Sequence, residues 1–225
     1  MKYFYNGVSL QNNRQINMDS LLLKSRRIGD KDAMLAVVCD GVGSLADGGY
    51  ASGTAVRLLN EWFGGETLTA RAGIRIRDII LDINAYVIKE AANHNIDTAS
   101  TLSALFLVDD YFYIAHIGDS RIYSYGDGLL KVLTNDDVSE SGELTAYLGK
   151  RADIFMQCYE GAAPGKIFMV CSDGLYKKMD AGQIIEKMLD WDKRPHDAPV
   201  NSLARYVIER GERDNITLAL IKATD

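Results

Sequence analysis

Four aspartates stand where apolar runs of this 225-residue sequence end or begin. They are Asp40, Asp119, Asp173 and Asp214. The first three follow an apolar run directly or within two residues, and the fourth lies just before one. Hard divalent cations such as Mg²⁺ and Mn²⁺ need several oxygen ligands, and carboxylates at strand ends can converge from distant positions of a chain. The pattern therefore indicates a site for divalent cations.

A plain turn is the competing interpretation of each aspartate taken alone. Asp-Gly is a favoured turn dipeptide, and both Asp40 and Asp173 are followed by glycine. Asp119 lies in a Gly-Asp-Ser sequence that is equally typical of a turn. One such dipeptide is weak evidence for chemistry, so the interpretation depends on the ordered set of motifs.

Eight short motifs follow one another along the chain. They are Arg14-x-x-Asn17-x-Asp19, Asp40-Gly41-x-Gly43, Ala99-Ser100-Thr101, Gly118-Asp119-Ser120-Arg121, Thr134-x-Asp136, Leu148-Gly149, Ser172-Asp173-Gly174 and Asp214-Asn215-x-Thr217. In this order and approximate spacing, the chain resembles the metal-dependent 2C-type serine/threonine protein phosphatases of the compact bacterial type. The resemblance covers nearly the whole chain.

The resemblance implies a fold, an activity and cofactors. The implied fold class is α+β, with two packed antiparallel β-sheets flanked by helices. The implied enzyme is a protein serine/threonine phosphatase that uses two Mn²⁺ or Mg²⁺ ions, with a third, weaker ion in similar bacterial enzymes. Hydroxide bridging the two metals would attack phosphoserine or phosphothreonine in line. The implied partners are phosphorylated proteins and a cognate serine/threonine kinase.

The same resemblance assigns the metal ligands. Asp40 would bridge both metals, and Asp173 and Asp214 would complete one of the two sites. The backbone carbonyl of Gly41 would bind the other metal. Asp119, together with Asp173, corresponds to the ligands of the third ion. For Asp119 a turn residue is an equally good interpretation.

Two further catalytic residues are implied. Asp19 would hold water bound to the metal. Arg14 corresponds to a phosphate-binding arginine, whose planar guanidinium donates two parallel hydrogen bonds to a phosphoryl group. Without the family match, a solvated surface arginine would be the better interpretation of Arg14.

Several positions differ from the family pattern. Met18 replaces a usual Glu or Gln, and a thioether is a poor partner for water on a hard cation. No histidine follows the Asp40 motif, Asp137 stands where a histidine is usual, and residues 139–147 form a shorter segment than the usual flap. These differences keep two alternatives open: a pseudophosphatase acting as a regulatory binding module, and a phosphatase of small phosphoesters.

Strands and helices must hold these residues in place. Short runs rich in β-branched and aromatic residues predict strands at 35–39, 102–108, 111–117, 121–125, 129–133, 166–171 and 216–221. Short turn-prone links predict a continuous antiparallel meander from about residue 100 to 134. Apolar residues three or four apart predict helices near 50–63, 76–91, 184–188 and 200–208, and a loop covers 194–199. This arrangement also indicates the α+β class.

Composition limits the remaining possibilities. Apolar residues make up 47% and charged residues 25%, which is typical of a folded globular protein, and the length favours a single domain over 1–225. The formal charge of −6 argues against nucleic acid as a partner. The sequence contains no apolar stretch suited to a signal peptide or a membrane span, which predicts a cytoplasmic protein. Cys39, Cys171 and His116 are expected to be buried in the core rather than reactive.

Overall fold

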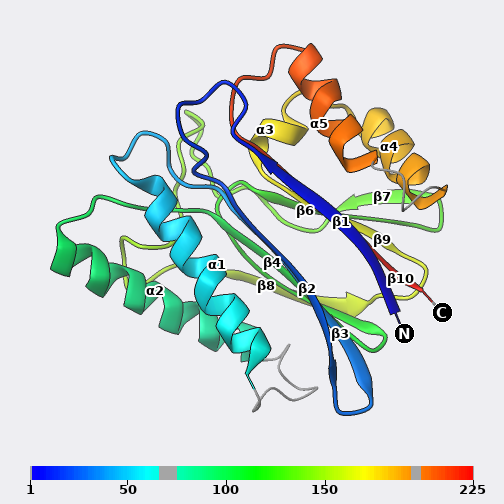
Figure 1. The fold of residues 1–225 in the computed structure, drawn as a ribbon, viewed down its shortest axis with the longest axis horizontal. Coiled ribbons are helices and arrows are strands. Elements are labelled where there is room, and N and C mark those ends of the chain that lie inside the picture. Colours follow the sequence, from blue (N-terminus) through cyan, green and yellow to red (C-terminus); the bar gives the residue numbers. More distant parts are fainter. Residues whose placement is uncertain (1, 66–74, 194–198, 225) are drawn as a thin grey trace.

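The computed structural model describes residues 2–65, 75–193 and 199–224 (Figure 1). Within these ranges the strands form two five-stranded antiparallel sheets. The first sheet has the order β1 (Lys2–Leu10), β10 (Ile216–Thr224), β9 (Ile167–Cys171), β6 (Arg121–Gly126) and β7 (Leu129–Val132). The second has the order β2 (Ser20–Ile28), β3 (Lys31–Cys39), β4 (Leu102–Val108), β5 (Tyr111–Ile117) and β8 (Gln157–Ala162).

Helices cover the outer face of each sheet (Figure 1). Helices α1 (Gly48–Gly64) and α2 (Ile76–His94) lie against the second sheet. Helices α3 (Asp173–Tyr176), α4 (Ala181–Lys193) and α5 (Pro199–Glu209) lie against the first. The predicted α+β sandwich of two antiparallel sheets flanked by helices is thus confirmed. No helix in the described ranges is both long enough and apolar enough to span a membrane.

The layers follow from the two-residue period of the strands, because successive side chains of a strand point to opposite faces. In β3, Met34, Ala36 and Val38 point toward the other sheet and belong to the core between the sheets. Leu35 and Val37 point the other way, into the core beneath α1 and α2. This continuous apolar run is what a strand buried on both faces requires.

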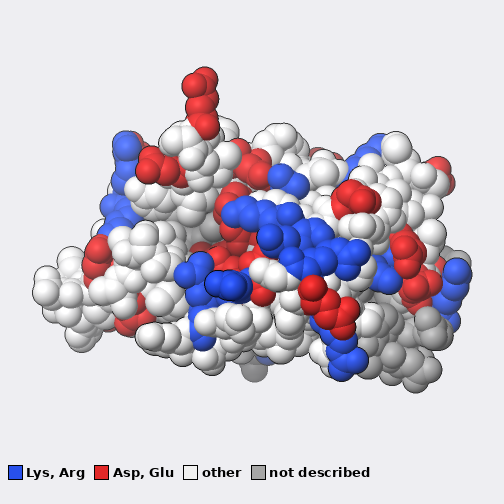
Figure 2. Space-filling model, turned by 90° about the horizontal axis from the view of Figure 1, so that it is seen from above, with Lys and Arg blue, Asp and Glu red and all other residues white. Residues whose placement is uncertain are grey.

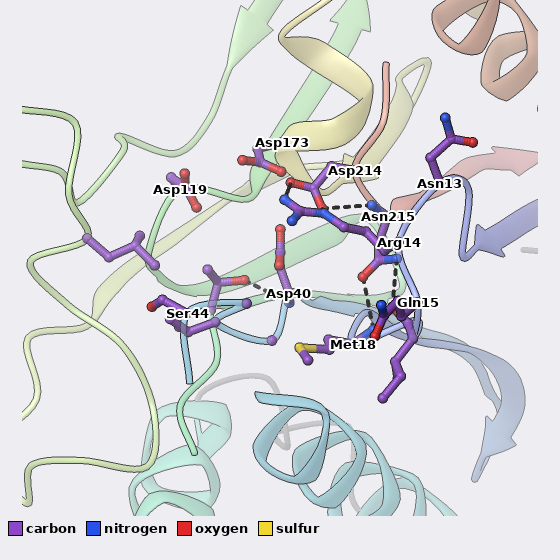
Figure 3. A pocket seen from close by; sticks show the side chains of 16 residues that line it. Asn13, Arg14, Gln15, Met18, Asp40, Ser44, Asp119, Asp173, Asp214 and Asn215 are labelled. Atoms are coloured by element: carbon purple, nitrogen blue, oxygen red, sulfur yellow. Dashed lines mark hydrogen bonds and ion pairs between the residues drawn. The ribbon is translucent and has the colours of Figure 1, made fainter. Parts of the chain in front are cut away.

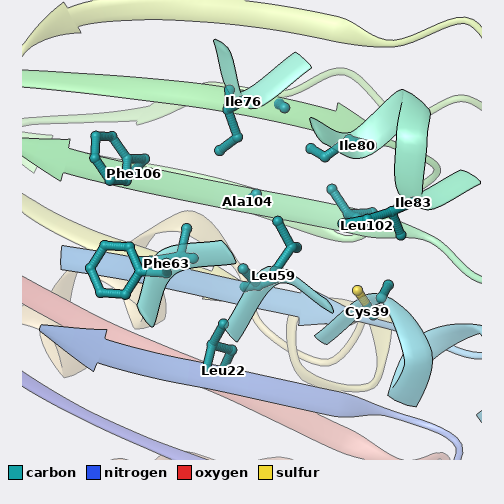
Figure 4. Close-up of a cluster of buried hydrophobic side chains, with 14 of the residues drawn as sticks. Leu22, Cys39, Leu59, Phe63, Ile76, Ile80, Ile83, Leu102, Ala104 and Phe106 are labelled. Carbon is teal, nitrogen blue, oxygen red and sulfur yellow. The ribbon is translucent and has the colours of Figure 1, made fainter. Parts of the chain in front are cut away.

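The core beneath α1 and α2 shows the same principle in side-chain detail (Figure 4). Leu59 and Phe63 of α1, Ile80 of α2 and Phe106 of β4 belong to this one buried cluster. The rings of Phe63 and Phe106 lie edge to face, with their centroids 6.0 Å apart. This packing fixes the strand whose end delivers Asp40, because Cys39, the last residue of β3, is fully buried in the same core.

The predicted continuous meander was wrong. Residues 109–110 and 127–128 do form two-residue hairpin turns, and Asp109 and Asp127 adopt the left-handed conformation with φ 52°. However, β5 pairs with β8 and β6 pairs with β9, so the link at 118–120 carries the chain from one sheet to the other. The local turn signal was correct, but tertiary packing decides whether the strands on either side of a turn pair.

Other differences concern elements with weak patterns. Strands β1, β2 and β8 and the single turn of α3 were not predicted. The predicted loop 194–199 lies outside the described residues apart from Pro199, which begins α5. The three expected core residues Cys39, Cys171 and His116 are fully buried, as predicted.

Candidate functional site

A pocket of about 730 Å³ is lined by loops and strand ends of both sheets (Figure 3). Its wall includes most of the residues that the sequence singled out, namely Arg14, Asp40, Gly41, Asp119, Asp173 and Asp214. They come from loops and strand ends far apart in the chain, and the two sheets bring them together. Asp19 is not part of the wall: it is 7% exposed and lies buried behind it.

Asp40 lies at the centre of the charged groups. The backbone N–H of Asp40 donates to Thr101 Oγ1 at 2.9 Å, and its carbonyl accepts from the Thr101 N–H at 2.8 Å. These bonds tie the end of β3 to the start of β4. Burial raises the pKa of Asp40 well above its usual value, and the charges of four other carboxylates raise it further. Those four belong to Asp19, Asp173, Asp119 and Asp214.

Gly41 is required by the close approach of neighbouring backbone. A Cβ atom at this position would lie 2.7 Å from the carbonyl oxygens of both Met18 and Gly48. Because real Cβ atoms do not approach backbone so closely, only glycine fits without a shift of the chain. The Gly41 N–H donates to Met18 O at 3.2 Å, which ties the Asp40 loop to the segment before β2.

Asp173 is placed by the tight contact of the following glycine. Asp173 is the first residue of α3, and a Cβ at Gly174 would lie 2.0 Å from the carbonyl oxygen of Asn215. Through this contact the start of α3 packs directly against the 214–215 loop, and Asp173 therefore lies beside Asp214. The carboxylate of Asp173 also forms an ion pair with Lys177, one helical turn later.

Asp214 is held by Arg14 in a bidentate pair. Arg14 Nε donates to Asp214 Oδ1 at 2.8 Å, and Arg14 Nη2 donates to Asp214 Oδ2 at 2.7 Å. Burial opposes ionisation of Asp214, but the hydrogen bonds from Arg14 and from the Asn215 N–H outweigh it, so its pKa is lowered. The loop around Arg14 is anchored by Asn12, whose side-chain amide donates to Asp214 O at 2.9 Å.

Asp19 is buried with incomplete hydrogen bonding. Ser172 Oγ donates to Asp19 Oδ2 at 2.9 Å, whereas Oδ1 of the same carboxylate has no hydrogen-bond partner among the described residues. Burial raises the pKa of Asp19 to about 6. A buried carboxylate oxygen without a donor is costly, and a bound cation or its water is one way to satisfy it.

Asp119 lies in the link that crosses between the sheets. Gly118 has φ 101°, and a Cβ there would lie 2.7 Å from the Thr101 side chain, so the link needs glycine. Tyr176 Oη donates to Asp119 O at 2.9 Å, which fixes the link against α3. Burial, followed by the charge of Asp173, raises the pKa of Asp119 to about 6.

The residues that differ from the family pattern have structural partners. Met18 lines the pocket, and its carbonyl accepts from Ser52 Oγ at 2.6 Å. Asp137, at a usual histidine position, accepts from the Gly118 N–H at 2.9 Å and from Gln157 Nε2 at 2.8 Å. Asp137 therefore holds the crossing link rather than facing the pocket.

The donor set fits divalent cations. Carboxylates and a backbone carbonyl are the ligands that Mg²⁺ and Mn²⁺ prefer, and a cluster of like charges around Asp40 needs cations to neutralise it. As they stand, no three acidic, cysteine or histidine side chains of the described ranges are grouped closely enough for one ion. Arg14 and Lys177 each hold one of the outer carboxylates.

Sequence reasoning missed Ser172, Tyr176 and Lys177. Ser172 stands in a quoted motif, but its bond to Asp19 joins positions 153 residues apart, which no local pattern reveals. Lys177 follows Asp173 by four residues, the spacing that places side chains on one face of a helix. This spacing would have indicated the ion pair between Lys177 and Asp173 only if the single turn of α3 had been predicted.

Comparison with known proteins places this geometry in a family. The model of the protein phosphatase 2C family matches residues 6–218. The serine/threonine phosphatase stp of Listeria monocytogenes is 27% identical over 214 residues, which cover 84% of this chain and 84% of that protein. The serine/threonine protein phosphatase PstP of Mycobacterium tuberculosis is 27% identical over 216 residues. That match covers 86% of this chain and 41% of PstP, so the chain spans less than half of that relative.

A solved structure agrees in fold. The crystal structure of the serine/threonine phosphatase Stp1 from Staphylococcus aureus superimposes on this chain with a TM-score of 0.89. The match covers 100% of this chain and 96% of the Stp1 chain. Its sequence identity to this chain is 18%, so the likeness concerns the fold. With the family model matching almost from end to end, the chain belongs to the protein phosphatase 2C family.

Proposed function

We propose that this chain is a metal-dependent phosphatase that hydrolyses phosphoserine and phosphothreonine in proteins. One observation carries the proposal: four aspartates from distant parts of the chain, Asp40, Asp119, Asp173 and Asp214, line one pocket. Such a cluster opposes folding unless cations compensate it. The names of the relatives, serine/threonine phosphatases, support this activity and substrate class.

The proposed ligands follow from this arrangement. Asp40 would bridge two Mn²⁺ or Mg²⁺ ions, Asp173 and Asp214 would complete one site, and the Gly41 carbonyl would complete the other. Asp119 would serve a third, weaker ion together with Asp173. When bound, such a pair of ions activates the attacking water and neutralises charge on the phosphoryl oxygens.

Two residues have proposed roles around these ligands. Arg14 lines the pocket with a side chain that is 55% exposed, so its guanidinium is free to turn from Asp214 to a phosphoryl group. It would bind and orient that group through two parallel hydrogen bonds. Asp19 is buried, and one of its carboxylate oxygens has no partner among the described residues; it would accept a hydrogen bond from a water molecule of the proposed metal site.

The surface around the pocket suits a phosphorylated protein. Figure 2 shows acidic side chains at the bottom of a hollow, with lysine and arginine side chains beside it. Arg14 and Lys177 are basic groups that pair with acidic side chains of the pocket wall, and each has a side chain that is 55% exposed. Basic groups at the rim attract a phosphate dianion, whereas the acidic floor receives cations. A cognate serine/threonine kinase, acting on the same substrates, is part of this proposal.

The location and extent of the domain also stay proposals. We infer a single catalytic domain over 1–225 that works in the cytoplasm. The three cysteines are free thiols, of which Cys39 and Cys171 are buried, and this state suits a reducing compartment.

The test is hydrolysis of p-nitrophenyl phosphate and a phosphothreonine peptide with Mn²⁺, with Mg²⁺ and with chelator. We expect turnover with either metal, none with chelator, and none in the Asp173→Asn variant. Turnover of p-nitrophenyl phosphate without turnover of the peptide would move the proposal to small phosphoesters. Absence of turnover in every condition would overturn the proposed activity and favour a regulatory binding module.

A further inference from the structure

Lys177 forms an ion pair with Asp173, a proposed ligand of the divalent cations. Lys177 Nζ donates to Asp173 Oδ2, and the two residues are four apart. The backbone N–H of Lys177 also donates to Asp173 O at 3.1 Å, which closes the single turn of α3. Because this turn places both residues on one face, the ammonium group stays within reach of the carboxylate.

The ammonium group also acts on the neighbouring carboxylates. Asp119 lies beside Asp173 in the pocket wall, so the ammonium group that pairs with Asp173 is also close to a second carboxylate (Figure 3). Lys177 is therefore a positive charge on the side of the pocket where Asp119 and Asp173 lie together (Figure 3).

We propose that Lys177 is an internal counter-ion that competes with a divalent cation for Asp173 and so lowers the metal affinity of the pocket. This inference rests on the proposed metal site. A cation that binds Oδ2 of Asp173 must displace the ammonium group, and one that binds the other oxygen is repelled by it. Displacement is feasible because the Lys177 side chain is 55% exposed, whereas that of Asp173 is 17% exposed. The lysine can move into solvent, and the aspartate stays in the pocket.

This competition makes metal loading depend on metal concentration. Without a divalent cation, Lys177 neutralises one carboxylate of a cluster that otherwise repels itself. With the cation bound, the lysine is released at the rim of the pocket. The chain would therefore need more Mn²⁺ to load its site than a variant that has a neutral residue at position 177.

Lys178 provides a matched control. It is exposed and adjacent in sequence to Lys177, and its replacement changes the net charge by the same amount. A change in Mn²⁺ affinity that follows from net charge alone should appear equally when Lys177 or Lys178 is replaced by a neutral residue. Only Lys177 has the ion pair with Asp173, so only its replacement should act through that carboxylate.

The experiment is calorimetric titration of Mn²⁺ into metal-stripped parent protein and its Lys177→Met, Lys177→Gln, Lys177→Arg and Lys178→Met variants. We expect Lys177→Met and Lys177→Gln to bind Mn²⁺ about three- to tenfold more tightly, as removal of one partly screened charge implies. Lys177→Arg keeps the charge, so this variant and Lys178→Met should stay within about twofold of the parent protein.

A second readout avoids activity altogether. The rise in Tm on adding Mn²⁺ should be larger in Lys177→Met than in the parent protein, because tighter binding to the native state stabilises it more. Equal or weaker Mn²⁺ binding by both neutral variants would overturn the role of Lys177 and leave the proposed metal site intact. No Mn²⁺ binding by the parent protein or any variant would overturn both.

Discussion

The guanidinium of Arg14 and the carboxylate of Asp214 are joined by two parallel hydrogen bonds across 200 positions of sequence. This pair unites the segment after β1 with the segment before β10, and those two strands are themselves paired. The pairing of the first and last strands of the chain therefore closes the pocket and sets a proposed phosphate-binding group beside a proposed metal ligand.

Replacement of Arg14 should affect substrate binding more than stability. We expect Arg14→Ala to raise KM for a phosphothreonine peptide about tenfold or more, and Arg14→Lys to recover only part of the loss because an ammonium group cannot bind bidentately. The pair with Asp214 is largely exposed, so the free energy of unfolding should fall by less than about 1 kcal/mol. Steady-state kinetics and urea denaturation measure both effects.

Arg213→Ala is the control for the Arg14 variants. Arg213 is exposed and one residue from Asp214, so its loss removes the same charge near the pocket. An equal rise in KM in Arg213→Ala would show that general electrostatic attraction, and not the bidentate geometry of Arg14, binds the substrate.

Gly174→Ala should disrupt the contact between α3 and the 214–215 loop. Because the new Cβ would lie 2.0 Å from a backbone oxygen, the backbone must move, and we expect a loss of roughly 2–4 kcal/mol in the free energy of unfolding. Gly43→Ala is the matched control, since a Cβ there meets nothing within 4 Å. Denaturation curves that coincide for the two variants would refute the account of how Asp173 is placed.

Asp19→Asn should stabilise the metal-free protein. At pH 7 the buried carboxylate is ionised, which destabilises the folded state, and a neutral amide of similar shape removes this effect. We therefore expect the free energy of unfolding, measured with chelator present, to rise by about 1–2 kcal/mol. Metal-dependent turnover should fall in the same variant. Urea denaturation in chelator measures the stability, and a less stable Asp19→Asn protein at pH 7 would contradict the prediction.

The increase in the free energy of unfolding caused by Asp19→Asn should be smaller at pH 5 than at pH 7. The pKa of Asp19 is raised to about 6 in the folded protein, above the value of 3.8 for a free side chain. Between these values the folded state binds more protons than the unfolded state, so the parent protein becomes more stable as the pH falls from 7 to 5. Asp119, whose pKa is also raised to about 6, titrates alike in both proteins and cancels in the comparison, whereas the pKa of Asp40 should fall in the variant because the charge of Asp19 helps to raise it.

Strong periodic patterns made much of the fold predictable. The run that ends at Cys39 alternates between two cores, and its length and β-branched content indicate a strand without any tertiary information. Strands β1 and β2 were missed because β1 contains Asn6 and Gly7 and because β2 carries several basic and polar side chains. Their pairing with strands elsewhere in the chain, not their own pattern, makes them strands.

The site was predictable in its residues but not in their pairing. The ordered motifs brought Asp40, Asp173 and Asp214 to attention, and the structure places all three in one pocket. The sequence could not show that the link at Gly118 changes sheets, nor that Lys177 reaches Asp173. Both features depend on contacts between elements, which a local pattern does not record.

The most direct test of the central claim is turnover of a phosphothreonine peptide by Asp40→Asn at saturating Mn²⁺, beside the parent protein. Because Asp40 is the carboxylate at the centre of the cluster, the account predicts a fall in kcat of about a thousandfold or more. The metal-free Tm should be equal to that of the parent protein or higher, because burial and four neighbouring carboxylates disfavour the ionised form of Asp40 and an amide cannot ionise. Turnover within a few-fold of the parent protein would contradict the claim that this cluster holds the catalytic metals.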